Sequence, residues 1–247
     1  MIEENSLILE NVNIAKNVYR MKFKSNNTDK LRPGQFINIK IDGLFLRRPI
    51  SLCQIEDGII TIIYKVFGRG TQKLSTYREG DTINIHLNLG NGFVVNPKVE
   101  KLLLIGGGVG VPPLYELAKR YRQLDKEVVA VLGFKSKDEV FLEEDFKKLG
   151  VNVFVATDDG SYGYKGNVIS LIETEHIDID FVYSVGPKAM LRAVQDKYQK
   201  GFISLEERMG CGMGACMGCV CHDSKDQTKY YRVCKEGPVF ELGKVVL

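Results

Sequence analysis

Residues 6 to about 95 carry the alternation of apolar and polar positions that is typical of β-strands. Five segments show it, at residues 6–15, 19–25, 34–41, 59–66 and 81–89. Turn-forming pairs such as Pro33-Gly34, Asp57-Gly58 and Glu79-Gly80 separate these segments and reverse the chain between neighbouring strands. Short strands at this spacing predict a small closed β-barrel or a β-sandwich.

A different pattern begins after Pro97, where apolar runs alternate with segments whose apolar residues recur at helical spacing. The predicted strands cover residues 101–105, 127–134, 151–157 and 181–186, and the predicted helices cover residues 112–124, 141–150, 167–175 and 187–200. Pro112 and Pro113 mark the start of the first helix, because proline suits the first helical turn. Strands that alternate with helices in this way predict a doubly wound parallel sheet.

The segment from Ile203 onward differs from both preceding regions, because it shows little regular periodicity and carries five of the six cysteines. We therefore expect three units in the chain. They are a β-barrel domain at residues 1–97, an α/β domain at residues 98–202 and a small C-terminal module at residues 203–247.

The composition of the chain excludes several classes of protein. Hydrophobic residues make up 44% and charged residues 26%, as in a globular protein with a core. The 34 lysines and arginines are interspersed with 31 aspartates and glutamates, so no basic patch predicts nucleic-acid binding. No window approaches the roughly 18–20 apolar residues of a membrane span, and the N-terminus does not resemble a secretory signal. We expect a cytoplasmic protein, in which clustered cysteines bind metal or serve redox chemistry.

Four cysteines stand in the glycine-rich run MGCGMGACMGCVC at residues 209–221. Cys211, Cys216 and Cys219 have the spacing C-x4-C-x2-C, and Cys234 follows farther along, which is typical of a plant-type 2Fe–2S cluster. Four thiolates and two sulfides around two ferric ions leave a net charge of about −2, which backbone N–H groups must balance. The interspersed glycines allow the loop to turn its amides towards sulfur. We predict that these four cysteines bind the cluster.

Other uses of these cysteines remain open. Cys216 and Cys219 with two further thiols would make a structural zinc site, although such sites usually combine two short Cys-x-x-Cys pairs and this chain has one. A disulfide framework is the second alternative, and the expected compartment argues against it. We interpret Cys221 as a bystander rather than a spare ligand, and Cys53 as a small buried apolar residue. The set of four cysteines is complete without His222.

The run Ile105-Gly106-Gly107-Gly108-Val109-Gly110-Val111 joins a predicted strand to a predicted helix, a place where phosphates bind against helix N-terminal amides. It departs from G-x-G-x-x-G, because Val111 stands at the third glycine position. The second strand ends in Phe134-Lys135-Ser136, so no carboxylate marks a ribose site there. Pyrophosphate binding and a tight corner both fit this turn. A second turn, Val185-Gly186-Pro187, lies at the carboxyl edge of the sheet, where ligands of such folds collect, although an ordinary corner also explains it.

Two segments of the barrel region have the residues of a diphosphate site. Arg47-Arg48-Pro49-Ile50-Ser51 leads a strand, and Gly68-Arg69-Gly70-Thr71 follows Ile63-Tyr64-Lys65. An arginine at a strand start with a serine three residues on can clamp a diphosphate and offer a hydroxyl to a ring nitrogen. A surface arginine and a capped strand are the alternative. The co-occurrence of these segments with the glycine turns and the cysteines favours a functional site.

The ordered motifs RPIS, IYK, GT, GGGVGVPP, VGP and C-x4-C-x2-C…C resemble those of the ferredoxin-reductase family extended by a 2Fe–2S module. The resemblance covers essentially the whole chain, is most specific in GCGMGACMGCVC with Cys234, and points to the electron-transfer subunits of dihydroorotate dehydrogenase B. It implies a barrel that binds FAD and an α/β domain that binds NAD. It also implies a partner catalytic subunit, carrying FMN and the pyrimidine substrate, against which the cluster lies.

The resemblance implies roles for single residues as well. Arg48 would hold the FAD diphosphate, Ser51 would approach the flavin N5, and Ile50 would pack near the isoalloxazine ring. The other residues implied in FAD binding are Pro49, Ile63, Tyr64, Lys65, Gly70 and Thr71. Those implied in binding the nicotinamide nucleotide are Gly106, Gly107, Gly108, Gly110, Gly186 and Pro187. Two positions depart from the family, since many ferredoxin reductases have Tyr where Ile50 stands and relatives often have Cys where Val185 stands.

The function that the resemblance implies is electron transfer in an NAD-dependent dihydroorotate dehydrogenase of pyrimidine biosynthesis. Electrons from the FMN of the partner would pass through 2Fe–2S and FAD to NAD+, in a heterotetramer with two chains of each kind. No side-chain acid or base is expected for the hydride step. One alternative is the small flavin and iron–sulfur subunit of an NADH-dependent ferredoxin:NADP oxidoreductase or of a sulfide dehydrogenase. Another is a zinc-stabilised binding module with no redox role.

Overall fold

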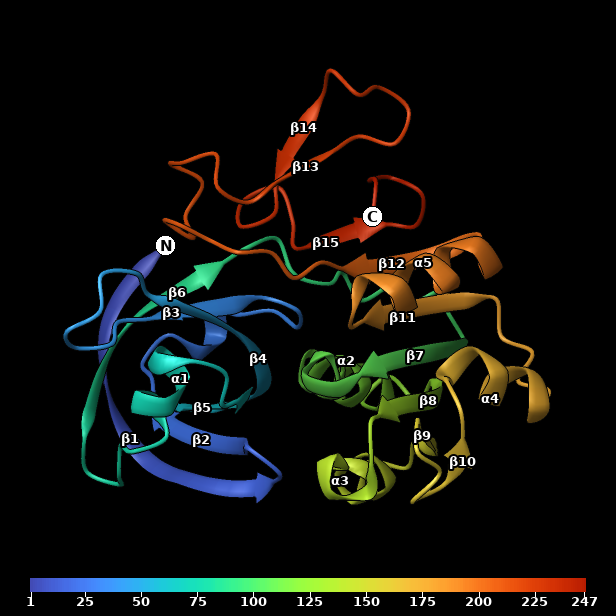
Figure 1. The fold of residues 1–247 in the computed structure, drawn as a ribbon, viewed down its shortest axis with the longest axis horizontal. Helices are drawn as coiled ribbons and strands as arrows, with labels where there is room; N and C mark the ends of the chain where they lie inside the picture. The colour runs from blue at the N-terminus through green and yellow to red at the C-terminus, as the bar shows by residue number, and fades with distance from the viewer.

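The computed structural model describes all 247 residues of the chain. A barrel of strands, drawn from blue to teal, stands beside a layer of alternating strands and helices drawn from green to orange (Figure 1). The C-terminal segment, drawn in red, lies across the top of both in this view (Figure 1). The cysteine-rich end of the chain therefore lies over the barrel and the sheet together.

Six antiparallel strands close into a barrel, which confirms the predicted barrel and excludes the sandwich. The strands are β1 (Ile2–Ala15), β2 (Val18–Lys24), β3 (Phe36–Ile39), β4 (Arg48–Glu56), β5 (Ile59–Lys65) and β6 (Thr82–Leu89), in the order β1-β2-β5-β4-β3-β6. The connections contain η1 (Thr28–Lys30) and α1 (Arg69–Leu74), a short helix that the strand pattern does not predict. Ile37 and Ile39 of β3 lie in the barrel core, whereas Asn38 between them points to the opposite face of the strand.

The second region is a doubly wound sheet, as predicted. Its parallel strands are β7 (Lys101–Gly107), β8 (Glu127–Phe134), β9 (Asn152–Thr157), β10 (Tyr164–Lys165), β11 (Phe181–Val185) and β12 (Lys200–Ser204), in the order β10-β9-β8-β7-β11-β12. The helices are α2 (Pro112–Arg122), α3 (Glu143–Lys148), α4 (Val168–Thr174) and α5 (Lys188–Lys197), with the short turns η2 (Gly108–Gly110) and η3 (Lys137–Glu139). None of the helices has the length and the apolar character that crossing a membrane requires.

Strand β7 shows why both faces of the sheet are covered. Leu102 and Leu104 lie in the core that α2 and α3 join, whereas Leu103 and Ile105 lie in the core that α4 and α5 join. Successive side chains of a strand point to opposite faces, so a continuous apolar run buries both of them. The first helix begins at Pro112, as the sequence predicts.

The C-terminal segment is more regular than the sequence predicts. Strand β13 (Val220–His222) pairs with β14 (Tyr230–Arg232), and β15 (Val239–Glu241) pairs antiparallel with β12 at the edge of the large sheet. Strands of three residues are too short to show a period, which is why the pattern does not reveal them. The sheet is thus mixed at this edge, and β12 crosses the expected boundary between residues 202 and 203.

Asn91 ties the C-terminal segment to the barrel end. Its backbone N–H donates to the carbonyl of Gly237 at 2.7 Å, and its side-chain amide donates to the carbonyls of Glu236 at 3.0 Å and Val239 at 2.7 Å. Its Oδ1 accepts from the backbone N–H of Val239 at 3.1 Å. The segment is therefore held by hydrogen bonds to the turn after β6 as well as by pairing with β12.

Glu116 of α2 joins the sheet region to the barrel. Its side chain is fully buried, and Oε2 accepts from the backbone N–H of Ile55 in β4 at 2.9 Å. The same carboxylate forms ion pairs with Arg120 at 2.7 Å and Lys119 at 3.7 Å, and Lys119 also donates to the carbonyl of Ile55. A buried carboxylate needs such partners, because burying an unpaired charge is costly. This contact helps to set the position of the barrel relative to α2.

We expect Glu116→Ala to lower the free energy of unfolding by about 1–3 kcal/mol, because the buried N–H of Ile55 loses its acceptor. Urea unfolding followed by circular dichroism measures the loss. Glu144→Ala is the matched control, since that carboxylate pairs with Lys147 on the surface and is 72% exposed. The control should unfold like the parent chain. Equal behaviour of the two variants would show that Glu116 does not hold the two regions together.

Candidate functional site

A cavity of about 590 Å³ opens between the barrel and the C-terminal segment. The barrel residues that the sequence predicts for a cofactor line it, with the exception of Gly70: they are Arg48, Pro49, Ile50, Ser51, Ile63, Tyr64, Lys65 and Thr71. Strands β4 and β5 are neighbours in the barrel, so the predicted segments at residues 48–51 and 63–65 line the same cavity. The structure thus brings these residues together, and their role in binding stays a prediction.

Gly70 does not line this cavity, but it determines where Arg48 lies. A Cβ atom at Gly70 would come within 2.1 Å of the Nε of Arg48, so a larger residue would displace the guanidinium. Arg48 also donates through Nη1 to the carbonyl of Leu46. A guanidinium has five N–H donors in a fixed fork, which leaves donors that can bind a phosphate.

Two hydroxyls near the cavity are already used within the chain. The Tyr64 hydroxyl donates to Asn11 Oδ1 at 2.9 Å, and burial raises the pKa of Tyr64. The Thr71 Oγ1 accepts from the backbone N–H of Phe67 at 2.7 Å and donates to its carbonyl at 3.0 Å. Thr71 therefore stabilises the connection from β5 to α1 through its hydroxyl. Only its backbone N–H, in the first turn of α1, is left for the phosphate contact that the resemblance implies.

Several residues that line this cavity have no site role assigned from the sequence. They are Phe36, Phe67, Val109, Lys135, Leu205, Glu206, Glu207, Met209 and Pro238. Phe36 pairs with Ser51 across β3 and β4, so the pairing of these two consecutive strands brings it to the site. Phe67 immediately precedes the Gly68–Thr71 motif, Val109 lies within the glycine turn and Met209 begins the cysteine-rich run, so these three were next to recognised motifs. The others come from distant parts of the chain.

A second cavity, of about 440 Å³, lies at the carboxyl end of the sheet. Gly107, Gly108, Gly186 and Pro187 line it, as the sequence predicts for a nucleotide site, whereas Gly106 and Gly110 do not. The strand order reverses between β7 and β11, and ligands of doubly wound sheets bind in the crevice at such a reversal.

Gly106 and Gly110 permit close packing instead. A Cβ at Gly110 would lie 2.4 Å from the carbonyl oxygen of Val185, and one at Gly106 would lie 2.8 Å from a methyl carbon of Val111. The Gly106–Gly110 turn therefore combines the two interpretations that the sequence left open. Some of its glycines face a cavity and others form a tight corner.

The two cavities lie side by side and share part of their walls. Lys65, Val109, Lys135 and Glu206 line both of them. Lys65 forms an ion pair with Glu139 at 2.8 Å, and Glu139 lines the second cavity. Molecules bound in the two cavities would therefore be close neighbours.

The four predicted ligand cysteines all accept hydrogen bonds from backbone N–H groups. Cys211 Sγ accepts from Cys216 at 3.3 Å and from Met213 at 3.5 Å, and Cys216 Sγ accepts from Cys211 at 3.5 Å. Cys234 Sγ accepts from Gly214 at 3.2 Å, and Cys219 Sγ accepts from Cys234 at 3.5 Å. Donors aimed at sulfur are what an anionic iron–sulfur cluster requires, so this loop fits one.

The hydrogen bonds also shift the acidity of the thiols. Burial acts to raise the pKa of Cys211, but N–H groups of Met213 and Cys216 outweigh it and lower that pKa to about 6. Burial raises the pKa of Cys234 to about 12, and its contact with the Cys219 thiol acts in the same direction. Metal binding removes the proton from a coordinating thiol, so coordination would outweigh the effect of burial on the pKa of Cys234.

The remaining cysteines have other surroundings. Cys221 lies in β13, it is buried, and burial raises its pKa to about 11. Cys53 of β4 is 2% exposed and its pKa is raised by burial, which confirms the prediction of a small buried apolar residue. His222 is exposed, and its Nδ1 lies 3.2 Å from the carbonyl of Gln227.

Comparisons with known proteins agree with this geometry. Residues 104–196 match the oxidoreductase NAD-binding domain, and residues 206–246 match the iron–sulfur cluster binding domain of dihydroorotate dehydrogenase B. The solved structure of an NADH-dependent reduced ferredoxin-NADP oxidoreductase superposes with a TM-score of 0.88 at 30% identity, covering 98% of this chain and 89% of that one. The ferredoxin reductase of a carbazole 1,9a-dioxygenase shares the fold, with a TM-score of 0.70 at 19% identity over 79% of this chain and 64% of that one.

Full-length relatives give the family. The electron transfer subunit of dihydroorotate dehydrogenase B (NAD(+)) from Bacillus cereus strain G9842 is 45% identical, over 100% of both chains. The subunit of the same description from Bacillus anthracis strain CDC 684 is 44% identical over the same coverage. The chain therefore belongs to the family of electron transfer subunits of the NAD-dependent dihydroorotate dehydrogenase B.

Proposed function

We propose that the chain passes electrons from the FMN of a catalytic partner, through a 2Fe–2S cluster and an FAD, to NAD+. The observation that carries the proposal is the common wall of the two cavities, since hydride transfer needs the flavin and the nicotinamide in contact. The bound flavin supplies the chemistry, because it can collect single electrons and deliver a pair. The chain's own residues bind and orient the two carriers and exclude water between them.

We assign FAD to the barrel cavity, with Arg48 holding the diphosphate and with Ile50 and Ser51 beside the ring. The nicotinamide nucleotide is assigned to the second cavity, against Gly107, Gly108 and the Gly186–Pro187 turn. Gly106 and Gly110 then act indirectly, by permitting the close packing of that turn. The remaining barrel residues of the proposed FAD site are Pro49, Ile63, Tyr64, Lys65, Gly70 and Thr71.

We retain the division into an FAD domain at residues 1–97, an NAD domain at 98–202 and a cluster module at 203–247. The two matched regions, 104–196 and 206–246, each fall within one of these units, which supports the division. We place the chain in the cytoplasm, because thiolate ligands need a compartment that keeps cysteines reduced.

The surface of the cysteine segment supports docking of the catalytic partner over the cluster. Four large apolar side chains of this segment are exposed there, namely Met213 at 39%, Met217 at 50%, Val220 at 37% and Tyr230 at 54%. Exposed apolar groups gathered in one region often mark a protein interface. We propose a heterotetramer of two electron transfer subunits and two FMN-containing subunits.

The similarity to the NADH-dependent reduced ferredoxin-NADP oxidoreductase favours a second candidate, the corresponding small subunit of such an enzyme. Its identity of 30% is lower than the 45% shared with dihydroorotate dehydrogenase B subunits. Purification of the native complex decides between them. An FMN-containing partner that oxidises dihydroorotate supports the first proposal, and a partner without that activity supports the second.

The isolated chain, reconstituted with iron, sulfide and FAD, should oxidise NADH with an artificial electron acceptor. It should not oxidise dihydroorotate, because no residue set in it accounts for a second flavin and a pyrimidine. Adding the catalytic partner should make NAD+ reduction depend on dihydroorotate. Absence of NADH oxidation in a cofactor-replete sample would contradict the proposed route.

Gly70→Ala should weaken FAD binding about tenfold to hundredfold, because the new methyl displaces Arg48 and a charged hydrogen bond is worth about 1.5–3 kcal/mol. Flavin retained after desalting and a fluorescence titration with FAD measure the effect. Gln72→Ala, an exposed position on the same helix, is the control and should bind FAD like the parent chain. Parent-like affinity in Gly70→Ala would place the diphosphate elsewhere.

Cys219→Ser should lose iron and acid-labile sulfide, because it removes one of the four proposed thiolate ligands. Cys221→Ser should retain about two iron atoms per chain, since we assign Cys221 no ligand role. Metal and sulfide analysis of anaerobically purified protein measures both. Loss of iron in Cys221→Ser would make Cys221 a ligand, and zinc in the parent chain would refute the cluster.

A further inference from the structure

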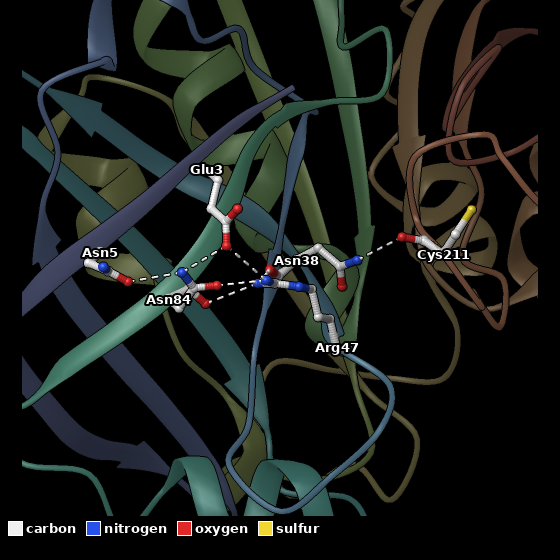
Figure 2. A network of polar contacts seen from close by, with 6 residues as sticks. All are labelled: Glu3, Asn5, Asn38, Arg47, Asn84 and Cys211. Atoms are coloured by element: carbon white, nitrogen blue, oxygen red, sulfur yellow. Dashed lines mark hydrogen bonds and ion pairs between the residues drawn. The ribbon is translucent and has the colours of Figure 1, made fainter.

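A polar patch on the outer face of the barrel lies beneath the cysteine segment. The patch contains Asn38 of β3, Asn84 of β6 and Arg47, and Figure 2 shows them joined by hydrogen bonds with Cys211 at one end. Asn38 points away from the barrel core, yet it is only 2% exposed because other parts of the chain cover it.

Asn38 makes a direct hydrogen bond to the cysteine loop. Its Nδ2 donates to the carbonyl oxygen of Cys211 at 3.2 Å (Figure 2). The next residue, Gly212, has a φ of +69°, and a Cβ there would lie 2.5 Å from the Asn38 Nδ2. The backbone of the Cys211–Gly212 turn therefore packs directly against the Asn38 amide. Only glycine at position 212 allows this close approach.

Arg47 anchors Asn38 from the barrel side. Its Nη1 donates to the backbone carbonyls of Asn38 and Asn84, each at 3.3 Å, and its Nη2 donates to Asn84 Oδ1 at 2.6 Å. Glu3 lies 3.4 Å from the same guanidinium. These contacts tie β1, β3 and β6 together around Asn38, the residue that donates to Cys211 (Figure 2).

The side-chain oxygen of Asn38 distinguishes this residue from an ordinary buried side chain. Its Oδ1 is buried and has no hydrogen-bond partner. An unsatisfied buried oxygen costs free energy that an apolar residue would avoid, and such groups often have a functional reason.

The position of Asn38 in the barrel links the two proposed cofactor sites. Asn38 pairs with Pro49 across β3 and β4, and Phe36 of the same strand pairs with Ser51. Phe36, Pro49 and Ser51 line the cavity that we assign to FAD. Phe36 and Asn38 are two residues apart and therefore lie on the same face of β3, so one face of this short strand contacts both the proposed flavin site and the Cys211 turn.

We propose that Asn38 is a positioning residue for the iron–sulfur site, which holds the Cys211–Gly212 turn against the flavin-lining part of the barrel and adjusts the electrostatic surroundings of the cluster. The proposal rests on the proposed function, because it takes Cys211 as a cluster ligand. The positive end of the Asn38 amide faces this turn. It therefore stabilises the extra negative charge that the cluster gains on reduction.

Two substitutions separate the hydrogen bond from the packing. Asn38→Leu removes the donor and keeps most of the volume, so it should lower the midpoint potential of the cluster. A change of about threefold in the one-electron equilibrium is expected, which is about 28 mV at 59 mV per tenfold. Asn38→Ala also opens the Cys211 turn to water, so iron release to a chelator should be at least about threefold faster. Potentials are measured by a redox titration followed by electron paramagnetic resonance.

Asn13 supplies the matched control. Its Nδ2 donates to the carbonyls of Ala15 at 2.9 Å and Val18 at 3.1 Å, the same amide-to-carbonyl chemistry in a part of the barrel away from the cysteine loop. Asn13→Leu and Asn13→Ala should leave the potential and the rate of iron release unchanged. All variants are made in the full chain with FAD bound.

The outcomes separate this proposal from the proposed function. Parent-like potentials in both Asn38 variants would overturn the positioning role, and faster iron release without a shift in potential would reduce Asn38 to a structural contact. A parent chain without iron and acid-labile sulfide would overturn the proposed function itself, and this inference with it. If Asn38→Leu does not fold, the potential and iron release of Asn38→Ala decide.

Discussion

The pairing of β15 with β12 is the constraint on which both the cysteine loop and the barrel cavity depend. It joins Phe202–Ser204 to Val239–Glu241, and the N–H of Leu205 continues the ladder by donating to the carbonyl of Pro238 at 2.9 Å. The ends of the cysteine segment are therefore fixed at one edge of the sheet, and the residues between them must fold beside the barrel. Leu205 and Pro238 also line the barrel cavity. One strand pair thus anchors the proposed cluster loop and completes the wall of the proposed flavin site.

Further contacts limit how the parts can move relative to one another. Asn91 holds the end of the cysteine segment on the barrel, Asn38 holds its beginning, and Glu116 holds α2 on β4. Electron transfer between separate carriers requires that their spacing be maintained, and side chains locked by buried hydrogen bonds maintain it. Asn38 and Glu116 are buried, and among the polar side-chain atoms at these contacts only the Asn38 Oδ1 is buried without a partner. They account for how a chain of several loops could present its cofactors at constant distances.

Glycine has two distinct uses in this chain, and the same motif contains both. Gly107 and Gly108 line the second cavity, where the absence of a side chain leaves backbone accessible to a ligand, although a Cβ at Gly107 would also lie 2.8 Å from the Cδ of Pro187. Gly110 is required by the carbonyl of Val185, and Gly70 by the guanidinium of Arg48. The sequence motif alone left these roles undivided, because a glycine pattern does not say which neighbour comes close. The distances from an added Cβ to atoms of other segments show which glycines close packing requires.

Local patterns determined the fold class and predicted the chemistry of the cysteines. Alternation in residues such as Ile37, Asn38 and Ile39 specifies a strand with two different faces, and the C-x4-C-x2-C spacing specifies a loop that can enclose a cluster. Only the tertiary structure decided that Glu206 lies between the two cavities and that Asn38 meets Cys211, 173 residues away. Periodicity records the contacts of a residue with its neighbours along the chain. Contacts made by barrel closure and by the return of β15 to the sheet leave no such record.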